Sequence, residues 1–409
     1  MNKEQFYQDA RNDLSGPLHG VKVLEVATTW AGPMCSAVLA DLGAEVIKVE
    51  IPAGDVGRGI FPQLPGTEVG FAQATVNRNK KGIVLDLSQP DGRAVCRDLA
   101  CQADIFIENF KVGTMSRYGL GYADLSALKP DLVYVSITGW GQFGPRHADA
   151  GYDPLAQATS GFLSINGSPD GPPTKAGTFL ADDLGGLHGA IGAMAALRHR
   201  DQTGEGQHVD VALLDSMLFQ SNGLLSLGAL GVSPGRNGNE FGFAVPANVF
   251  DCQDAPVYVG VLLDSHWQIL ASEVLDQPDL ATNPAFATGE ARAANRDMCN
   301  LLLGEWLAAR PREEAMAVLT GKGLPIARVQ TFGEAAQDEH VLARDMLQTV
   351  TFNNGDSAPV TGPAAKFSKT PTRVRTAAPD LGEHTEEVLT QLGLDEAQRR
   401  DLFERGIAK

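Results

Sequence analysis

Two adjacent acids precede an apolar stretch near the middle of the chain. Asp182 and Asp183 lie in the sequence Leu-Ala-Asp-Asp-Leu-Gly-Gly (180–186), directly ahead of a predicted helix over 184–200. One interpretation is structural, because an acid at a helix start caps free backbone N–H groups. The other is chemical: a carboxylate held there stays ionised and attacks a carbonyl carbon, while nearby glycine-flanked amides stabilise the oxyanion. The residues alone leave both interpretations open.

Other polar residues that could do chemistry lie in predicted turns or follow strands. Asp153, in a Gly-Tyr-Asp-Pro turn, is either a turn residue or a second active-site carboxylate. The run Asn-Arg-Asn-Lys-Lys-Gly (77–82) carries three positive charges, which would hold a phosphate or would simply face water. Arg58, Asn109 and Arg117 leave the same two possibilities, in loops where an α/β sheet collects ligands.

The sequence lacks the motifs of several other classes of enzyme. It contains no G-x-x-x-x-G-K-[ST] and no H-E-x-x-H, and its first strand-to-helix turn lacks G-x-G-x-x-G. The G-x-S-x-G match at 231–235 falls in a predicted linker, where a nucleophilic serine is not expected. The five cysteines have no metal-ligand spacing. These absences argue against ATP-driven ligation, nicotinamide binding, a serine hydrolase and a metal site.

Net charge and composition limit the kinds of partner and the cellular compartment that we expect. Fifty acidic and 33 basic residues give a net charge of −17, which argues against nucleic-acid binding. The odd, scattered cysteines favour a reducing compartment. The polar start is unlike a signal peptide, and no apolar stretch approaches the roughly 18 residues of a membrane span. We expect a cytoplasmic protein that binds neither nucleic acid nor a membrane.

Alternating strands and helices must position these side chains. Strands are predicted over 21–27, 45–50, 83–87, 104–110 and 132–138, with helices over 33–42 and 90–103 between them. The pattern predicts an α/β fold with a doubly wound parallel sheet and helices on both faces.

The second half of the chain predicts a smaller α/β domain. A Gly- and Asn-containing linker over 231–242 leads to a strand at 257–263 and helices at 266–275 and 292–310. Strands at 325–329 and 348–352 are expected to return to the first domain, which ends in a helix at 386–392. We therefore expect a large domain over 1–225, a linker and small domain over 226–324, and a return to the large domain over 325–409.

A family resemblance is carried by short segments spread over almost the whole chain. They are the stretches at 16–25, 31–33, 42–50, 79–80, 84–87, 107–110, 170–173, 203–207 and 381–389. In their order and spacing the chain resembles the family III CoA-transferases, the CaiB/BaiF family, which includes formyl-CoA transferase and carnitine CoA-transferase. The resemblance implies a Rossmann-like large domain, a small domain and an interlocked homodimer.

The resemblance also implies roles for individual residues. The family's nucleophilic aspartate matches Asp182, and its auxiliary acid matches Asp153, with Tyr152 beside it near CoA. The positions implied for CoA binding are Thr29, Trp30, Leu85, Asn109, Arg117 and Tyr152. From their charge and polarity we expect Arg58, Asn79 and Lys80 to bind CoA as well. No tightly bound cofactor and no metal is implied, since coenzyme A and acyl-CoA are substrates.

The activity implied is transfer of CoA between an acyl-CoA thioester and a free carboxylic acid without ATP. Asp182 would form a mixed anhydride and then an aspartyl-CoA thioester. One alternative is an α-methylacyl-CoA racemase, a branch that has a histidine where this chain has Tyr152. Another is a noncatalytic acyl-CoA-binding protein, which would not need both Asp182 and Asp153.

The acid transferred is expected to be bulkier and more apolar than formate or oxalate. Trp30 stands where formyl-CoA transferase has a glutamine, and Ala150 and Ile51 stand at positions that are basic in that enzyme. Trp30, Phe241, Phe243 and Val245 either line an acyl pocket or pack in the core.

Overall fold

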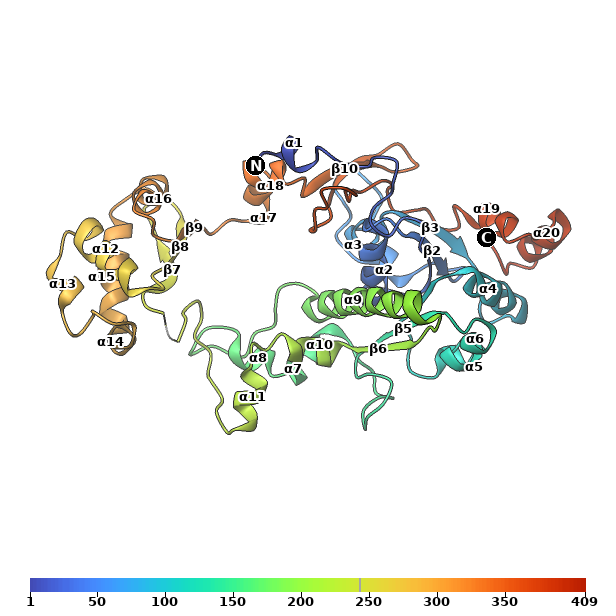
Figure 1. Ribbon diagram of the computed structural model, residues 1–409, viewed down its shortest axis with the longest axis horizontal. Helices are drawn as coiled ribbons and strands as arrows, with labels where there is room; N and C mark the ends of the chain where they lie inside the picture. Colours follow the sequence, from blue (N-terminus) through green and yellow to red (C-terminus); the bar gives the residue numbers. More distant parts are fainter. Residues whose placement is uncertain (243) are drawn as a thin grey trace. The chain divides into compact units, whose positions relative to one another are not determined.

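The computed structural model describes residues 1–242 and 244–409, so Phe243 lies outside the described residues. The chain forms two compact units (Figure 1). Unit 1 comprises Met1–Phe162, Ala176–Gly231 and Glu339–Lys409, and unit 2 comprises Leu163–Lys175 and Val232–Asp338. The functional domain boundaries expected from the sequence stay a prediction.

Unit 1 is built around a six-stranded sheet in which every neighbouring pair is parallel. Its order is β3-β2-β1-β4-β5-β6. The strands are β1 (Lys22–Val26), β2 (Glu45–Glu50), β3 (Lys80–Val84), β4 (Ile105–Glu108), β5 (Val133–Thr138) and β6 (His208–Ala212). The predicted α/β class and parallel sheet are confirmed, while β3 begins three residues earlier than expected and β6 was not foreseen.

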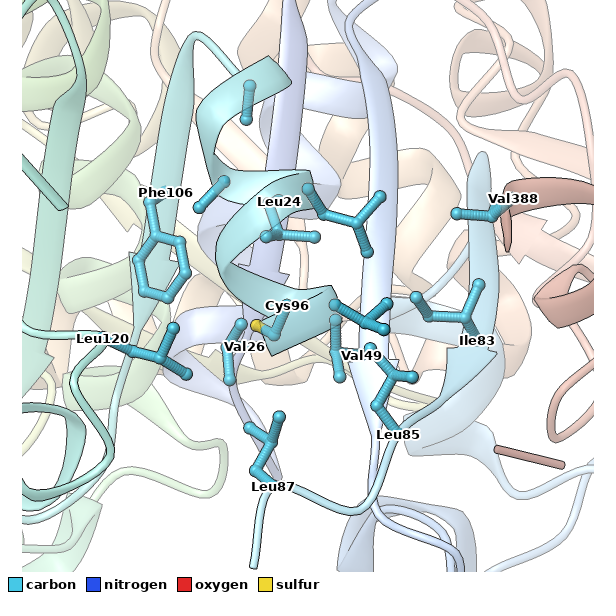
Figure 2. Close-up of a cluster of buried hydrophobic side chains, with 14 of the residues drawn as sticks. Leu24, Val26, Val49, Ile83, Leu85, Leu87, Cys96, Phe106, Leu120 and Val388 are labelled. Carbon is cyan, nitrogen blue, oxygen red and sulfur yellow. The ribbon is translucent and has the colours of Figure 1, made fainter. Parts of the chain in front are cut away.

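Helices cover both faces of this sheet. Alternate residues of a strand point to opposite faces. Val23 therefore joins the core under α2 (Ala31–Asp41) and α9 (Leu180–Thr203), whereas Leu24 joins the core under α4 (Pro90–Gln102). Figure 2 shows the second core, in which Cys96 of α4 lies among Leu24, Val26 and Phe106. Two apolar layers therefore fix the sheet from either side, as a doubly wound fold requires.

The helices of unit 1 vary widely in length, and α9 is the longest of those described. They are α1 (Lys3–Phe6), α2 (Ala31–Asp41), η1 (Val56–Gly59), α3 (Phe71–Val76), α4 (Pro90–Gln102), α5 (Thr114–Arg117), α6 (Tyr122–Leu128), α7 (Asp153–Thr159), α9 (Leu180–Thr203), α10 (Leu213–Phe219), α11 (Leu224–Ala229), α18 (Glu339–Ala343), α19 (Thr385–Gln391) and α20 (Glu396–Glu404). Helix α8 (Phe162–Ile165) crosses the division between the units. A two-stranded antiparallel sheet, β10 (Leu347–Thr351) and β11 (Ser357–Thr361), completes unit 1.

Unit 2 contains a three-stranded antiparallel sheet packed against helices. Its strands are β7 (Ala247–Asp251), β8 (Pro256–Gly260) and β9 (Ile326–Arg328). Its helices are α12 (Asp264–Ile269), η2 (Leu270–Val274), α13 (Asp279–Thr282), α14 (Gly289–Ala294), α15 (Arg296–Ala308), α16 (Arg312–Gly321) and α17 (Phe332–Ala335). Because β9 pairs with β8, the expectation that the strand at 325–329 returns to the first domain is wrong.

Neither a membrane-spanning helix nor a metal-binding cluster of side chains occurs among the described residues. None of the described helices combines the length and apolar character needed to cross a membrane. Among the same residues, no group of three or more His, Cys, Asp or Glu side chains is arranged to hold a metal ion.

Candidate active site

The sheet order changes direction between β1 and β4, and ligands of doubly wound folds bind beyond the carboxyl ends of strands at such a point. Thr28 follows β1 and Asn109 follows β4. The Thr28 N–H donates to Asn109 Oδ1 at 2.9 Å, and Asn109 Nδ2 donates to the Thr28 carbonyl at 2.8 Å. Asn109 therefore ties the two loops together at the position where a ligand is expected.

Asp55 holds the loop after β1 from its other side. Thr29 has a left-handed backbone with φ 69°, which is strained for a β-branched residue. Thr28 Oγ1 and the Thr29 N–H donate to Asp55 Oδ1 at 2.7 and 2.9 Å. Burial works to raise the pKa of Asp55, but the Lys48 ammonium, 2.8 Å away, and its hydrogen bonds lower that pKa to about 2. The ionised Asp55 thus fixes the loop that leads to Trp30.

Three carboxylates gather at the start of α9, and two of them have hydrogen-bond donors. Asp153 accepts from the Ala181 N–H at 2.7 Å and from Gln157 Nε2 at 2.8 Å. Asp183 accepts from Trp30 Nε1 at 2.7 Å. Asp182 accepts no hydrogen bond from any residue in the part of the chain that the structure describes. The sequence-predicted pair Asp182 and Asp153 is therefore brought together, with Asp182 left open.

The surroundings of Asp182 oppose its ionisation. Burial, followed by repulsion from Asp153 and Asp183, raises the pKa of Asp182 to about 7. Its place in the first turn of α9 does not hold the pKa of this carboxylate at its ordinary value, because burial and the two neighbouring acids oppose the charge. A carboxyl group with a pKa near neutrality is typical of an active site.

Neither acid is the N-cap of α9, although both lie in its first turn, where a negative charge is favourable. Helix α9 begins at Leu180, four residues earlier than expected, so Asp182 and Asp183 belong to its first turn. The residue before the helix is Phe179, and its side chain makes no capping hydrogen bond. Both acids are therefore available for other roles.

Trp30 lies next to this group of acids. Its indole is buried, with Phe179 and Phe71 at centroid distances of 4.9 and 5.8 Å. Its one polar atom donates to Asp183, which places the indole against the first turn of α9. Of the four residues suggested for an acyl pocket, Val245 instead belongs to the core of unit 2, and Phe241 is exposed.

The glycines that follow Asp183 serve helix packing. A Cβ on Gly186 would lie 2.9 Å from Met34 Cβ of α2, and one on Gly185 would lie 2.5 Å from Leu213 Cδ2 of α10. Both glycines are inside the helix, where their N–H groups are placed for the helical ladder. The expectation that glycine-flanked amides stabilise an oxyanion is therefore not supported, and first-turn N–H groups are better placed.

The basic run at 77–82 is largely buried, so the expectation that it faces water is wrong. Lys80 Nζ donates to Glu25 Oε2 at 2.6 Å, the Pro33 carbonyl at 2.9 Å and Asn77 Oδ1 at 3.2 Å. These bonds use all three of its donors, so Lys80 has none left for a phosphate. The predicted CoA contact at Lys80 is withdrawn for that reason.

Asn79 is likewise occupied. Its Nδ2 donates to Asp41 and to the Arg373 carbonyl, and its Oδ1 accepts from the backbone of Arg375 and Thr376. Asn79 and Lys80 line a cavity of about 950 Å³ at the amino ends of β1 to β3. That cavity lies at the opposite edge of the sheet from Thr28 and Asn109, so we do not assign Asn79 to the active site.

The other predicted CoA contacts differ in what they can offer. The Leu85 side chain is fully buried, which leaves only its main chain for a ligand. Arg58 forms a two-bond pair with Glu50 at 2.7 and 2.6 Å. Arg117 and Tyr152 are exposed, and Arg117 makes no ion pair with the described residues. Arg117 is thus the predicted basic residue with a free charge.

The residues 18–385 match the protein-family model described as CoA-transferase family III. The chain is a family III CoA-transferase. It is 35% identical to the succinyl-CoA:mesaconate CoA-transferase of Haloarcula marismortui, over 94% of this chain and 98% of that protein. It is 37% identical to the succinate–glutarate CoA-transferase of Agrobacterium fabrum, over 92% and 96%. A crystal structure of a CaiB/BaiF family protein from Brucella suis, 35% identical, superposes with a TM-score of 0.83 and covers 92% of this chain and 100% of that one.

Family membership confirms the activity implied by the resemblance. This CoA-transferase exchanges CoA between acyl-CoA thioesters and carboxylic acids, so the racemase and the noncatalytic binding protein are set aside.

The sequence analysis missed Asp55 and the buried ions beneath it. Glu25 and Lys48 are register partners on β1 and β2, and Lys48 Nζ lies 2.7 Å from Glu25 Oε1. A signal was present, because Glu25 and Lys48 each lie between two apolar residues of a strand and carry charges of opposite sign. Facing charges in adjacent parallel strands predict a buried pair, which in this CoA-transferase supports the loop before Trp30.

Proposed function

We propose that this CoA-transferase works through covalent catalysis by Asp182. An Asp182 oxygen attacks the thioester carbon of the donor, and the C–S bond breaks to give a mixed anhydride and CoA thiolate. The thiolate then attacks the aspartyl carbonyl, which releases the donor acid and leaves an aspartyl-CoA thioester. The acceptor carboxylate repeats these two steps in reverse order, so the acceptor leaves as acyl-CoA and Asp182 is regenerated.

The observation that carries this proposal is the difference among the three carboxylates. Asp153 and Asp183 are each held by donors within 2.8 Å, whereas Asp182 accepts no hydrogen bond from the described residues. An oxygen that must form a covalent bond is best left without a competing donor. Because its pKa is near 7, a substantial fraction of Asp182 is ionised and nucleophilic at neutral pH.

Asp153 supports the nucleophile as an auxiliary acid. Its carboxylate joins the N-terminus of α7 to that of α9 through the Ala181 N–H. Its negative charge also contributes to the raised pKa of Asp182. We assign oxyanion stabilisation to the first-turn N–H groups of α9 that have no intrahelical partner.

For the substrates, we propose succinyl-CoA as a donor and a short dicarboxylic acid as the acceptor. The support is the naming of the similar enzymes, which act on succinyl-CoA with mesaconate and on succinate with glutarate. The CoA moiety would bind at the loops after β1 and β4, with Arg117 as the partner of its phosphates and Tyr152, Thr29 and Asn109 nearby. Arg58 is retained only for its remaining free donor.

We also propose the interlocked homodimer of the family for this chain. Unit 1 exposes large apolar side chains on α9, α10 and α11, namely Leu187, Ile191, Phe219, Leu225 and Leu227. Exposed apolar groups in such number are typical of a surface that a partner subunit covers.

The test is capture of the acylated aspartate. Incubation with labelled succinyl-CoA and hydroxylamine is expected to convert Asp182 to the hydroxamate, which peptide mass spectrometry locates. Asp182→Asn should lose both the adduct and the exchange. Asp183→Asn is the matched control on the neighbouring residue and should keep the adduct at Asp182. Full exchange by Asp182→Asn would overturn the assignment.

A further inference from the structure

Asp183 has a defined partner that the covalent mechanism does not use. Its Oδ1 accepts from Trp30 Nε1 at 2.7 Å, and Trp30 lies at the start of α2, far from Asp183 in sequence. Burial raises the pKa of Asp183 and the Trp30 hydrogen bond opposes that shift. The bond therefore joins the first turn of α9 to the loop fixed by Asp55 and Asn109.

The Trp30 indole is confined on its other sides by apolar groups. Phe179 and Phe71 contact it as neighbouring rings, and Met34 and Ile60 pack against the same cluster. A buried indole N–H without an acceptor is unfavourable, because the group has lost its hydrogen bond to water. The hydrogen bond to Asp183 thus helps to fix the orientation of the Trp30 ring.

This cluster meets the first turn of α9 at two points, the Phe179 ring before the helix and the Asp183 carboxylate next to Asp182. An acyl group bound to Asp182 is held one residue from Asp183 and three from Phe179. Asp183 is close enough to Asp182 to contribute to its raised pKa, so the indole that Asp183 holds lies beside the first turn of α9 that carries the proposed site of acylation.

We propose that Asp183 is a positioning residue which, through its hydrogen bond to Trp30, fixes the indole as the wall that limits the size of the acyl group transferred at Asp182. This inference rests on the proposed function, because it takes Asp182 as the site of acylation. It adds a determinant of acid selectivity that acts through chain length.

The experiment compares acceptor acids of the same type and different length. With succinyl-CoA as donor, kcat/KM is measured for glutarate and for the longer adipate and suberate in the wild type and variants. Trp30→Phe and Asp183→Ala are each expected to lower the preference for glutarate over suberate about tenfold, the low end of what a single methylene group is worth in a fitted pocket. Asp183→Asn keeps an acceptor oxygen and should keep the wild-type ratio.

The double variant Trp30→Phe/Asp183→Ala tests whether the two residues act together. Because both single changes remove the same hydrogen bond, the double variant should shift the ratio no further than Trp30→Phe alone. Phe71→Leu alters the wall without touching that bond and should shift the ratio in the same direction, which provides a readout if Asp183→Ala does not fold.

Two failures are distinguishable. If the length ratio is unchanged in Trp30→Phe, Asp183→Ala and Phe71→Leu while Asp182→Asn is inactive, the inference about the wall is overturned and the proposed function stands. If Asp182→Asn retains exchange, the proposed function itself is overturned. A uniform loss of activity with all acids would show a merely structural role and would also contradict the inference.

Discussion

Asp182, the nucleophile that we propose, lies where its ionised form is destabilised. A carboxyl group in water ionises readily, yet burial and two neighbouring acids raise the pKa of this one to about 7. No cation among the described residues lowers that pKa, although Lys48 does so for Asp55 nearby. A cation therefore stabilises the ionised form of the acid that holds the loop, whereas no cation of the described residues stabilises that of the acid that we propose as the nucleophile.

The first prediction is that Asp182→Asn stabilises the protein while removing activity. The unfolded carboxyl ionises near its ordinary pKa of 3.8, whereas the folded one keeps its proton until about pH 7. The unfolded state therefore loses protons first, so wild-type stability falls as the pH rises from about 4 to 7 and is level above that. Asparagine avoids this loss, and after allowance for partial exposure the gain should be on the order of 1 kcal/mol at pH 8.

Urea unfolding at pH 5 and pH 8 measures this difference. The gain from Asp182→Asn should be larger at pH 8 than at pH 5. A variant that is equally or less stable than the wild type at pH 8 would show that Asp182 is not destabilised by its surroundings.

The second prediction separates two basic residues that the sequence alone treats alike. Lys80→Met removes a partner of buried Glu25 and should lower the free energy of unfolding by about 3 kcal/mol. Arg117→Ala, at an exposed position without an ion pair to the described residues, should leave stability within about 0.5 kcal/mol of the wild type. It should weaken CoA binding about tenfold, since charge-assisted bonds are worth about 1.5–3 kcal/mol. Thermal unfolding measures the change in stability, and calorimetric titration measures the affinity for CoA. If Lys80→Met weakened CoA binding and left stability unchanged, Lys80 would belong to the ligand site.

At the scale of the elements, the contact between α9 and α2 depends on small residues. Gly186 allows the backbone of α9 to lie against Met34 and Ala31 of α2, and Gly189 does the same for Cys35. These glycines lie in α9, the helix that carries Asp182. Their close packing against α2 therefore fixes the position of the first turn of α9 relative to Trp30. Packing and catalysis thus meet in one helix.

The third prediction is that Gly186→Ala disturbs this contact. The new Cβ would lie 2.9 Å from Met34 Cβ and 3.0 Å from the Ala31 carbonyl oxygen, so the helices must move apart. Overpacking of this kind costs about 1–3 kcal/mol and should reduce kcat through the displaced Asp182. Gly321→Ala in α16 is the control, since nothing lies within 4 Å of its Cβ and alanine favours a helix by about 0.5–1 kcal/mol. Equal stability changes in the two variants, by chemical denaturation, would contradict the close contact.

How far the sequence predicts these elements depends on how local the signal is. The strand at Glu45–Glu50 and the helix at Pro90–Gln102 follow closely from apolar periodicity and helix-start residues. The start of α9 was missed because Phe179 offers no side-chain cap, and β9 was misassigned because its partner β8 is distant in sequence. Lys80 looked like a surface charge, since its partner Glu25 is on another strand. Pairing between distant segments, rather than propensity, accounts for the misses.

At the scale of the whole molecule, the proposed interlocked dimer has a consequence that an ordinary dimer lacks. Two chains that merely pack together separate and recombine while folded, at a rate set by dissociation. Two chains that thread through each other separate only when at least one of them unfolds. Oligomeric stability and folding stability then become the same quantity, and the apparent unfolding midpoint rises with protein concentration.

The last prediction therefore concerns subunit exchange. Two preparations of the full chain, each with a different affinity tag, are mixed under native conditions for several days and analysed by native mass spectrometry. Both should remain dimers of a single tag, because exchange would require crossing the unfolding barrier. Unfolding the mixture in urea and refolding it should give mixed dimers in about the statistical proportion of one half. Mixed dimers that form within hours without denaturant would contradict threading and would indicate a simple packed dimer. A monomer at every concentration would contradict the dimer itself. The exposed apolar side chains of α9, α10 and α11 would then lack the partner that we assign to them.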